Sequence, residues 1–284
     1  MKRCPYCGKE YPDEATLCAT DQEPLVGEAS PGQAVAVPVK TVEKQAFNLT
    51  YPDYQWSARD AWKCVAFLVF FGLVLWPEII VLILTLVHPL YEWRANGVGF
   101  FFLHLVRYAI ELLAAAYFAR TDTLAAFWQG FSLKFQPTEL AWFGIVCALA
   151  IRFFGHIMRV HGWSHGVPFY DLKAFQDAAG PQRYFYLGPS MLLAPLFEES
   201  VYRGLLYKAF RGSYSMAAST ALIVIWTTYT HWLYYSHSWA AAVELSLLTV
   251  VQCYLREKSA SLWDCIFCHF AFNFSLLFVG DPLR

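Results

Sequence analysis

Charged residues are scarce in this sequence. Only 15% of its 284 residues are Asp, Glu, Lys or Arg, whereas a soluble globular domain usually carries about 25%. Because 57% of the residues are hydrophobic, the deficit argues against both an ordinary soluble enzyme and a disordered chain. The formal net charge of -1 provides no basic excess, so nucleic-acid binding is not expected. Aromatic residues are instead abundant, at 18%, as in membrane proteins with interfacial aromatic belts.

Long apolar runs are also missing from the first part of the chain. The first 50 residues contain no run of the length that a secretory signal peptide needs, so none is expected. Long apolar runs begin at about residue 64, after a polar segment rich in Pro and Gly. We therefore expect three parts, which are a small head at 1–26, a flexible linker at 27–60 and a transmembrane domain at 61–284.

The head contains three cysteines, an odd number that fits poorly with a self-contained disulfide framework. Cys4 and Cys7 are separated by two residues, and Gly8 allows the tight turn that aims both thiolates at one ion. Cys18 follows, with Asp21 where a second cysteine pair would end. The segment resembles a bacterial zinc-ribbon head, which implies a structural zinc bound by the three cysteines and Asp21. The alternative is a degenerate ribbon without metal.

The remainder of the chain contains seven apolar stretches, each near the roughly 20 residues that cross a bilayer. They predict an all-α polytopic membrane protein with about seven transmembrane helices. Most of the 21 Lys and Arg residues fall on the same side of these stretches as the amino terminus. The positive-inside rule then places that terminus in the cytoplasm, and we expect a multi-pass protein of the bacterial inner membrane. The predicted spans are 64–87, 98–119, 139–158, 185–210, 214–234, 239–255 and 260–279.

Ionisable residues inside the spans need a reason, because a charge at the bilayer centre costs at least about 2.5 kcal/mol. Glu198 and Glu199 are adjacent and point about 100° apart on a helix, so we expect them to have different partners. Glu199 and Arg203 are four residues apart, in the acid-first order, and are expected to pair. Glu198 then lacks a cation on its own helix, which makes it a candidate general base.

Two histidines and one asparagine in later spans are candidates for the same site. His231 lies late in the fifth predicted span, and His269 and Asn273 lie four residues apart on one face of the seventh. At a rise of about 1.5 Å per residue, their depths agree with that of Glu198 within the error of the span boundaries. The sequence therefore predicts one shared pocket.

These residues carry a resemblance to a known family. Residues 198–203 match the EExxxR motif of the CAAX protease and bacteriocin-processing family (CPBP, also called Abi), and residues 269–273 match its HxxxN motif. The middle motif of that family is FxxxH, whereas here Thr227 stands four residues before His231 and Trp226 lies one position earlier. The resemblance covers roughly residues 100–279, and the packing beneath His231 is expected to differ from the family pattern.

The resemblance implies an intramembrane endopeptidase of the glutamic type. In this reading Glu198 and His231 activate a water, and His269 and Asn273 stabilise the oxyanion, for which amide and imidazole N–H groups are suitable donors. No cofactor is expected for catalysis, although a Glu, two His and an Asn can also hold a metal. The implied substrate is a membrane-associated or lipidated protein or peptide, such as a prenylated CAAX protein, a bacteriocin precursor or a sorting signal.

The resemblance also implies supporting roles for Glu199 and Arg203, which would order the helix and the region that receives a substrate carboxylate. The head is expected to bind an unidentified protein partner. Glu244 and Asp264 are predicted either to serve the site or to pair structurally. Cys265 and the cysteine three residues later have CxxC spacing, but an apolar span does not favour redox or metal chemistry there.

Structural roles remain the alternative for the candidate residues. The acidic pair and its arginine can form a buried ionic staple between helices, and the two histidines can be hydrogen-bonded packing residues. At the level of function, the alternative is a catalytically silent scaffold or bacteriocin-immunity-type protein that keeps the fold, which the threonine at position 227 favours slightly. A transporter would need a continuous polar path, whereas the charges cluster on only a few spans.

Overall fold

The structure of the head is a small antiparallel sheet of three two-residue strands in the order β2-β1-β3. The strands are β1 (Lys2–Arg3), β2 (Glu10–Tyr11) and β3 (Val26–Gly27). The expected zinc ligands Cys4, Cys7, Cys18 and Asp21 lie outside the described residues, as does most of the predicted linker. The computed structural model describes residues 2–3, 10–16, 25–27, 57–76, 97–119, 135–163, 180–231 and 238–278.

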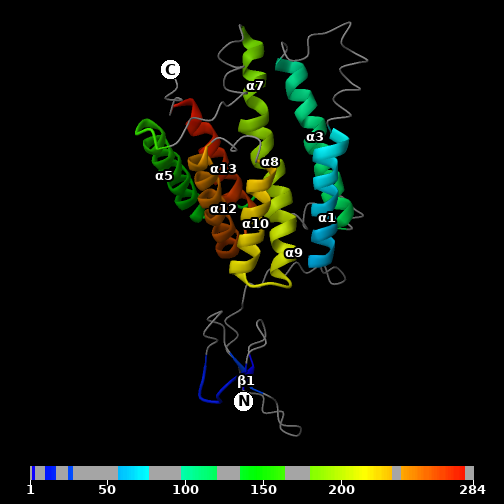
Figure 1. The fold of residues 1–284 in the computed structure, drawn as a ribbon, viewed down its shortest axis with the longest axis vertical. Helices are drawn as coiled ribbons and strands as arrows, with labels where there is room; N and C mark the ends of the chain where they lie inside the picture. The colour runs from blue at the N-terminus through cyan, green and yellow to red at the C-terminus, as the bar shows by residue number, and fades with distance from the viewer. Residues whose placement is uncertain are drawn as a thin grey trace.

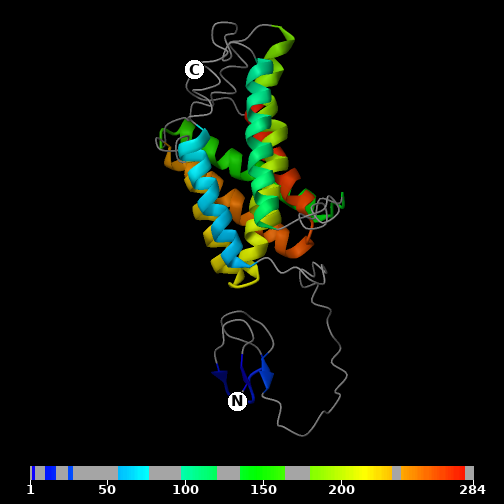
Figure 2. The same cartoon turned by 90° about the vertical axis from the view of Figure 1, so that its right-hand side faces the viewer.

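The rest of the described chain is helical, and its helices lie side by side in one bundle (Figures 1 and 2). One long helical rod, from residue 181 to residue 211, alternates between α, π and 3-10 geometry. The elements of this rod are η3 (Pro181–Arg183), α7 (Tyr184–Gly188), η4 (Pro189–Leu193), α8 (Ala194–Glu199), η5 (Ser200–Leu206) and α9 (Tyr207–Arg211). The others are α1 (Ala58–Phe70), η1 (Phe71–Leu75), α3 (Gly97–Phe118), α5 (Leu140–Val160), α10 (Met216–Thr230), α12 (Trp239–Ser259), α13 (Leu262–Phe274) and η6 (Ser275–Leu277).

Each of the seven predicted spans overlaps helical residues, which agrees with an all-α membrane protein. Within the described ranges, two helices are long and apolar enough to cross a membrane by length and composition, namely α3 and α5. The count of seven spans therefore stays a prediction. The first helix begins at Ala58, six residues before the predicted span, because Ser57 accepts a hydrogen bond from the backbone N–H of Asp60 and caps it.

Serine caps also fix the start of three later helices. Ser215, Ser238 and Ser261 precede α10, α12 and α13, and each accepts a hydrogen bond from a backbone N–H in the first turn. Such caps satisfy amide groups that have no partner within the helix. At the other end of α12, Ala260 adopts the left-handed conformation with φ of 55°, which turns the chain directly into α13. The short connection places α12 and α13 side by side.

The core of the bundle consists of two main apolar clusters. One joins α1 and α3 to η5, α9 and α10, and the other joins α5 to α12 and α13. Helix α5 approaches its neighbours closely at Gly144, where an added Cβ would lie 2.7 Å from Leu255 and 3.1 Å from Cys268. The long rod from 181 to 211 belongs to the first cluster through η5 and α9, and it contacts α13 of the second group through α8.

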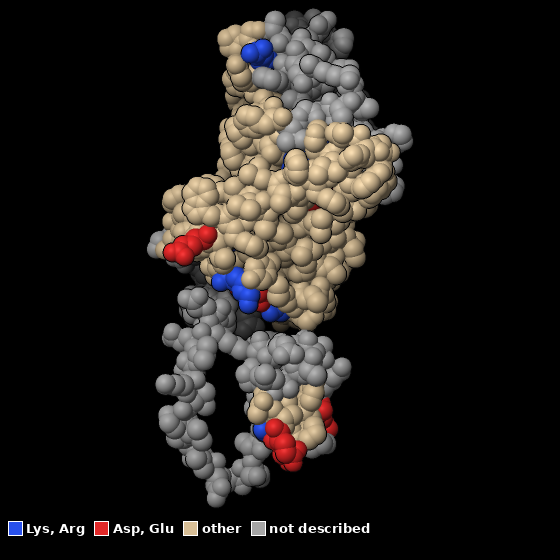
Figure 3. Space-filling model, turned by 90° about the vertical axis from the view of Figure 1, so that its left-hand side faces the viewer, with Lys and Arg blue, Asp and Glu red and all other residues tan. Residues whose placement is uncertain are grey.

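The outer face of α5 is apolar. Trp142, Val146 and Phe153 are large apolar residues with most of their side-chain surface exposed. Figure 3 shows the face that carries α5, and charged side chains of the helical body lie mainly toward its ends. A broad exposed apolar surface marks contact with lipid or with another protein. It agrees with the membrane location predicted from composition.

A buried ion triad joins α5 to α12. Glu244 accepts a hydrogen bond of 2.7 Å from Arg152 and pairs with Arg159 through its other carboxylate oxygen. Gly155 makes room for this carboxylate, because an added Cβ would overlap Glu244 Oε1 at 1.7 Å. The Arg152 guanidinium also lies over the Phe272 ring, 3.7 Å from its centroid. Of the two alternatives for Glu244, the structure supports structural pairing.

Candidate active site

The two adjacent glutamates lie where the long rod changes from α to π geometry, with Glu199 as the last residue of α8 and Ser200 as the first of η5. The Ser200 hydroxyl donates a hydrogen bond of 2.6 Å to the Leu196 carbonyl beneath it. Turns of π-helix within α-helices are frequent at functional sites. As the helical spacing predicts, Glu198 and Glu199 have different partners, which come from α3 and α13 respectively.

Glu198 faces two other helices. Tyr108 of α3 donates a hydrogen bond of 3.0 Å from its hydroxyl to Glu198 Oε1. The second oxygen, Oε2, lies 3.9 Å from His231 Nε2 at the end of α10. A gap of this size is suited to a bridging water that hydrogen-bonds to both groups. Glu198 therefore presents one fixed oxygen to Tyr108 and one oxygen to the histidine.

The tautomer of His231 follows from its contact with the backbone. His231 Nδ1 lies 2.8 Å from the carbonyl oxygen of Thr227, which can only accept a hydrogen bond, so Nδ1 carries the proton. In the neutral ring, Nε2 then has a lone pair and faces Glu198. Thr230 also contacts Nδ1, at 3.2 Å. Since the atom that holds the ring is a backbone carbonyl, this contact does not depend on the side chain at position 227.

Glu199 is the centre of a buried hydrogen-bond network. Its Oε1 atom accepts hydrogen bonds from Arg203 at 3.2 Å, from Gln252 at 2.9 Å and from His269 Nδ1 at 2.8 Å. Glu199 is fully buried and Arg203 is 1% exposed. The predicted pairing of Glu199 with Arg203 is present. Neither residue is among those that line the cavity described below, and Glu199 contacts the cavity lining through His269.

His269 and Asn273 of α13 are both held by neighbouring elements. A carboxylate only accepts hydrogen bonds, so His269 must donate from Nδ1 to Glu199, and its Nε2 atom is left as the other polar atom of the ring. Asn273 donates from Nδ2 to the Ser190 carbonyl at 2.7 Å. The Ser190 carbonyl belongs to the π-helical segment η4. The amide group of Asn273 has a second N–H that this contact does not use.

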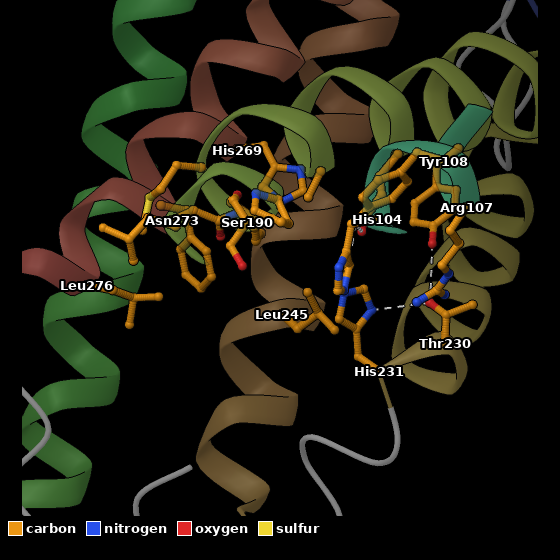
Figure 4. Close-up of a pocket in the computed structure, with 18 of the residues that line it drawn as sticks. His104, Arg107, Tyr108, Ser190, Thr230, His231, Leu245, His269, Asn273 and Leu276 are labelled. Carbon is orange, nitrogen blue, oxygen red and sulfur yellow. Dashed lines mark hydrogen bonds and ion pairs between the residues drawn. The ribbon is translucent and has the colours of Figure 1, made fainter. Parts of the chain in front are cut away.

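The four candidates Glu198, His231, His269 and Asn273 line one cavity of about 140 Å³. Figure 4 shows its labelled residues in two groups on opposite sides. One group contains His269, Asn273 and Ser190, and the other contains His104, Arg107, Tyr108, Thr230 and His231. The structure thus places the expected water-activating histidine across the cavity from the expected oxyanion donors.

Helix α3 supplies a wall of the cavity that the sequence did not assign to the site. His104, Arg107, Tyr108 and Glu111 all line it. Arg107 and Glu111 are four residues apart on this helix and pair at 2.9 Å. Tyr108 gave no signal, because one tyrosine among many aromatic residues in an apolar stretch has no motif around it. Gln252 was also missed, because a single amide in α12 has no motif around it.

Other polar residues considered in the sequence have structural contacts. Asp264 accepts hydrogen bonds from the backbone N–H and hydroxyl of Thr138, at 2.9 and 2.6 Å, and so fixes the start of α5. Cys265 and Cys268 are buried free thiols, and the Cys265 thiol donates to the Gln252 carbonyl. Within the described residues, no group of three His, Cys, Asp or Glu side chains is arranged to hold a metal ion.

Comparison with known families supports the resemblance read from the motifs. Residues 181–275 match a family model described as type II CAAX prenyl endopeptidase Rce1-like. The match supports the CPBP family for this part of the chain, and with it a protease of the CAAX type at family level. The matched family is membrane-embedded, which agrees with the apolar helices. Neither the curated proteins nor the solved structures contain a match to the chain.

The matched segment contains all four candidate residues, from Glu198 on α8 to Asn273 on α13. It does not contain α1, α3 or α5. The cavity is therefore completed by α3, which lies outside the match but brings Tyr108 to Glu198.

Proposed function

We propose that this protein is an intramembrane endopeptidase of the CAAX-protease type, which hydrolyses a peptide bond in a membrane-associated or lipidated protein. The observation that carries the proposal is the convergence of Glu198, His231, His269 and Asn273 on one cavity. The family match of residues 181–275 supports the same class of reaction. The distances within the cavity support the following sequence of steps.

A water between Glu198 Oε2 and His231 Nε2 would donate one hydrogen bond to each of them, since both atoms accept. Its oxygen attacks the carbonyl carbon of the scissile bond while a proton passes to this pair of bases. A tetrahedral intermediate forms, the C–N bond breaks, and the same proton goes to the leaving amine nitrogen. Each turnover therefore consumes one water and returns the site to its starting protonation.

The oxyanion of the intermediate would be stabilised from the opposite side of the cavity. Asn273 offers the N–H that its contact with Ser190 leaves unused. His269 donates from Nε2 only as an imidazolium, because its Nδ1 proton is directed at Glu199. The buried Glu199 carboxylate supplies the counter-charge for that form. The site needs no metal in this scheme.

The distribution of basic residues supports a cytoplasmic amino terminus. Arg59 and Lys63 lie at the start of α1, and Arg211 and Lys258 lie near the ends of α9 and α12. Trp62 packs on Phe210 and Arg211 pairs with Glu257, so these helix ends lie together at one end of the bundle. We propose that this end faces the cytoplasm, in the inner membrane of a bacterium.

Replacing Glu198 with alanine is expected to abolish cleavage without unfolding the protein. The test compares membrane proteomes of deletion cells that express wild type or Glu198→Ala, and records new protein termini. Termini that appear only with wild type identify the substrate and its cut site. Glu139→Ala, which removes an exposed carboxylate outside the cavity, is the matched control and should restore every terminus. Identical termini with Glu198→Ala and wild type would favour the silent scaffold.

We also propose a structural zinc in the head, held by Cys4, Cys7, Cys18 and Asp21. The support is the spacing of three thiolates with an oxygen ligand, a set that zinc accepts. Purified full-length protein is expected to contain about one zinc per chain, and Cys4→Ser is expected to lose most of it. Cys147→Ser, at a partly buried free thiol of α5, serves as the control. Equal zinc content in wild type and Cys4→Ser would exclude the site.

A further inference from the structure

We infer that Tyr108 is a positioning residue, which orients the Glu198 carboxylate so that its Oε2 atom faces His231. The inference rests on the proposed function, and it extends the site to a helix outside the segment that matches the family. Tyr108 belongs to α3, ninety residues before Glu198 in the chain. Its hydroxyl donates to Glu198 Oε1 at 3.0 Å.

Packing holds the Tyr108 ring in place. The side chain is 9% exposed and lies in a small apolar cluster with Leu193 and Ala194. It stacks on Phe197, with the ring centroids 5.5 Å apart and the planes at 26°. A phenol fixed in this way leaves only the rotation of its O–H bond, so the direction of the donated hydrogen bond is set by the packing.

The position of α3 along the rod is also fixed. Phe101 lies against Gly188 so closely that an added Cβ at Gly188 would be 2.6 Å from the Phe101 ring. Phe101 is two helical turns before Tyr108, on the same helix. This contact and the stacking of Tyr108 place the phenol at the height of Glu198. The hydrogen bond is thus a consequence of how α3 docks on the rod.

The direction of the second carboxylate oxygen, Glu198 Oε2, determines whether a water can be held between Glu198 and His231. The terminal torsion of a glutamate is soft, so a carboxylate without a fixed partner rotates freely. With Oε1 bound to Tyr108, Oε2 is directed toward His231 Nε2 at 3.9 Å. Loss of the phenol hydroxyl removes this orientation.

The groups that face Glu198 come from several helices. Of the described residues, Tyr108 is the one that hydrogen-bonds to it. The other ionisable groups around the cavity are His104, Arg107 and Glu111 on α3, Tyr202 on η5, His231 after α10 and His269 on α13. Arg107 pairs with Glu111, and Tyr202 contacts Thr230. Tyr108→Phe changes none of these pairs, so its effect should report on Glu198.

Tyr108→Phe is expected to lower kcat by about ten- to a hundredfold with little change in KM, since a hydrogen bond to a charged group is lost. The full-length chain is assayed on the substrate found by terminal profiling. Tyr207→Phe is the matched control, because Tyr207 is also buried and donates to a glutamate, Glu257, at 3.0 Å. It should keep wild-type kcat.

A second measurement needs no substrate. Infrared spectra recorded at one fixed pH report the hydrogen bond to Glu198 through its carboxylate stretching frequencies, and Glu198→Gln identifies the band. The Glu198 band is expected to shift in Tyr108→Phe and to stay unchanged in Tyr207→Phe. An unchanged band together with an unchanged kcat in Tyr108→Phe would overturn the inference, even where Glu198→Ala abolishes cleavage. A shifted band in a protein that cleaves nothing would instead overturn the proposed function.

Discussion

His231→Ala is expected to reduce kcat/KM by a factor of about 100 to 10,000, the contribution typical of general acid–base catalysis. The physical reason is the fixed tautomer of the ring, in which Nδ1 is bound to the Thr227 carbonyl and Nε2 faces Glu198. Without the imidazole, a water near Glu198 loses its second acceptor, and the leaving amine loses a proton donor. The measurement is steady-state cleavage of the profiled substrate by purified protein.

Folding should survive this substitution. His231 is the C-cap of α10, and its backbone N–H makes the cap contact to the Thr227 carbonyl, which alanine also provides. The matched control is His161→Ala, because His161 is likewise a helix C-cap, at the end of α5, and lies outside the cavity. Both variants should have thermal unfolding midpoints near that of wild type, and only His231→Ala should lose activity. Equal activity in the two variants would exclude His231 as a base.

The contact between His231 and the Thr227 carbonyl also predicts how substitutions at position 227, where the family motif has Phe, affect activity. The side chain at position 227 does not hold the histidine, since the contact is made by the backbone carbonyl. Thr227→Val, which keeps size and backbone, is therefore expected to retain activity close to wild type. A large loss of kcat in this variant would mean that the threonine hydroxyl takes part. The departure from Phe would then be a functional change.

The sequence predicted the parts of the site that depend on local spacing. Helical geometry separates Glu198 from Glu199 by about 100°, so it could be predicted from adjacency alone that their partners differ. The pairing of Glu199 with Arg203 follows from a spacing of four residues. The order of the motifs on successive helices predicted a common pocket, and these residues do line one cavity or contact one of its members.

Partners that come from distant helices could not be predicted in this way. The hydrogen bond between Tyr108 and Glu198 joins residues ninety positions apart, and it depends on which helices are neighbours in the bundle. Periodicity shows that a helix is apolar but does not show which other helix it contacts. Gln252 could not be predicted either, because nothing in the sequence around this one amide of α12 indicates that it donates to Glu199. The head shows the opposite case, in which a motif is visible in sequence and its cysteines lie outside the described residues.

Arg203→Met is expected to lower the free energy of unfolding by about 3 to 5 kcal/mol, the usual cost of breaking a buried ion pair on one side. Arg203 and Glu199 are both almost fully buried, so the substitution leaves a buried carboxyl group with only Gln252 and His269 as donors. Unfolding in mixed detergent, followed by tryptophan fluorescence, measures the loss. Lys63→Met is the control, because Lys63 also pairs with an acidic residue on its own helix, Asp60, but is 50% exposed at the start of α1. It should cost less than about 1 kcal/mol.

The double variant Glu199→Gln/Arg203→Met separates charge from packing. If the single variant is unstable because a charge is left buried, removing both charges should restore most of the stability. If the loss instead comes from the shape of the arginine, the double variant should be as unstable as the single one. The activity of the double variant tests whether Glu199 also contributes to catalysis. With Glu199 replaced by Gln, His269 loses the carboxylate that balances its imidazolium form. The double variant should therefore fold but cleave more slowly than wild type. A stable double variant with wild-type kcat would show that the Glu199 network only supports the fold.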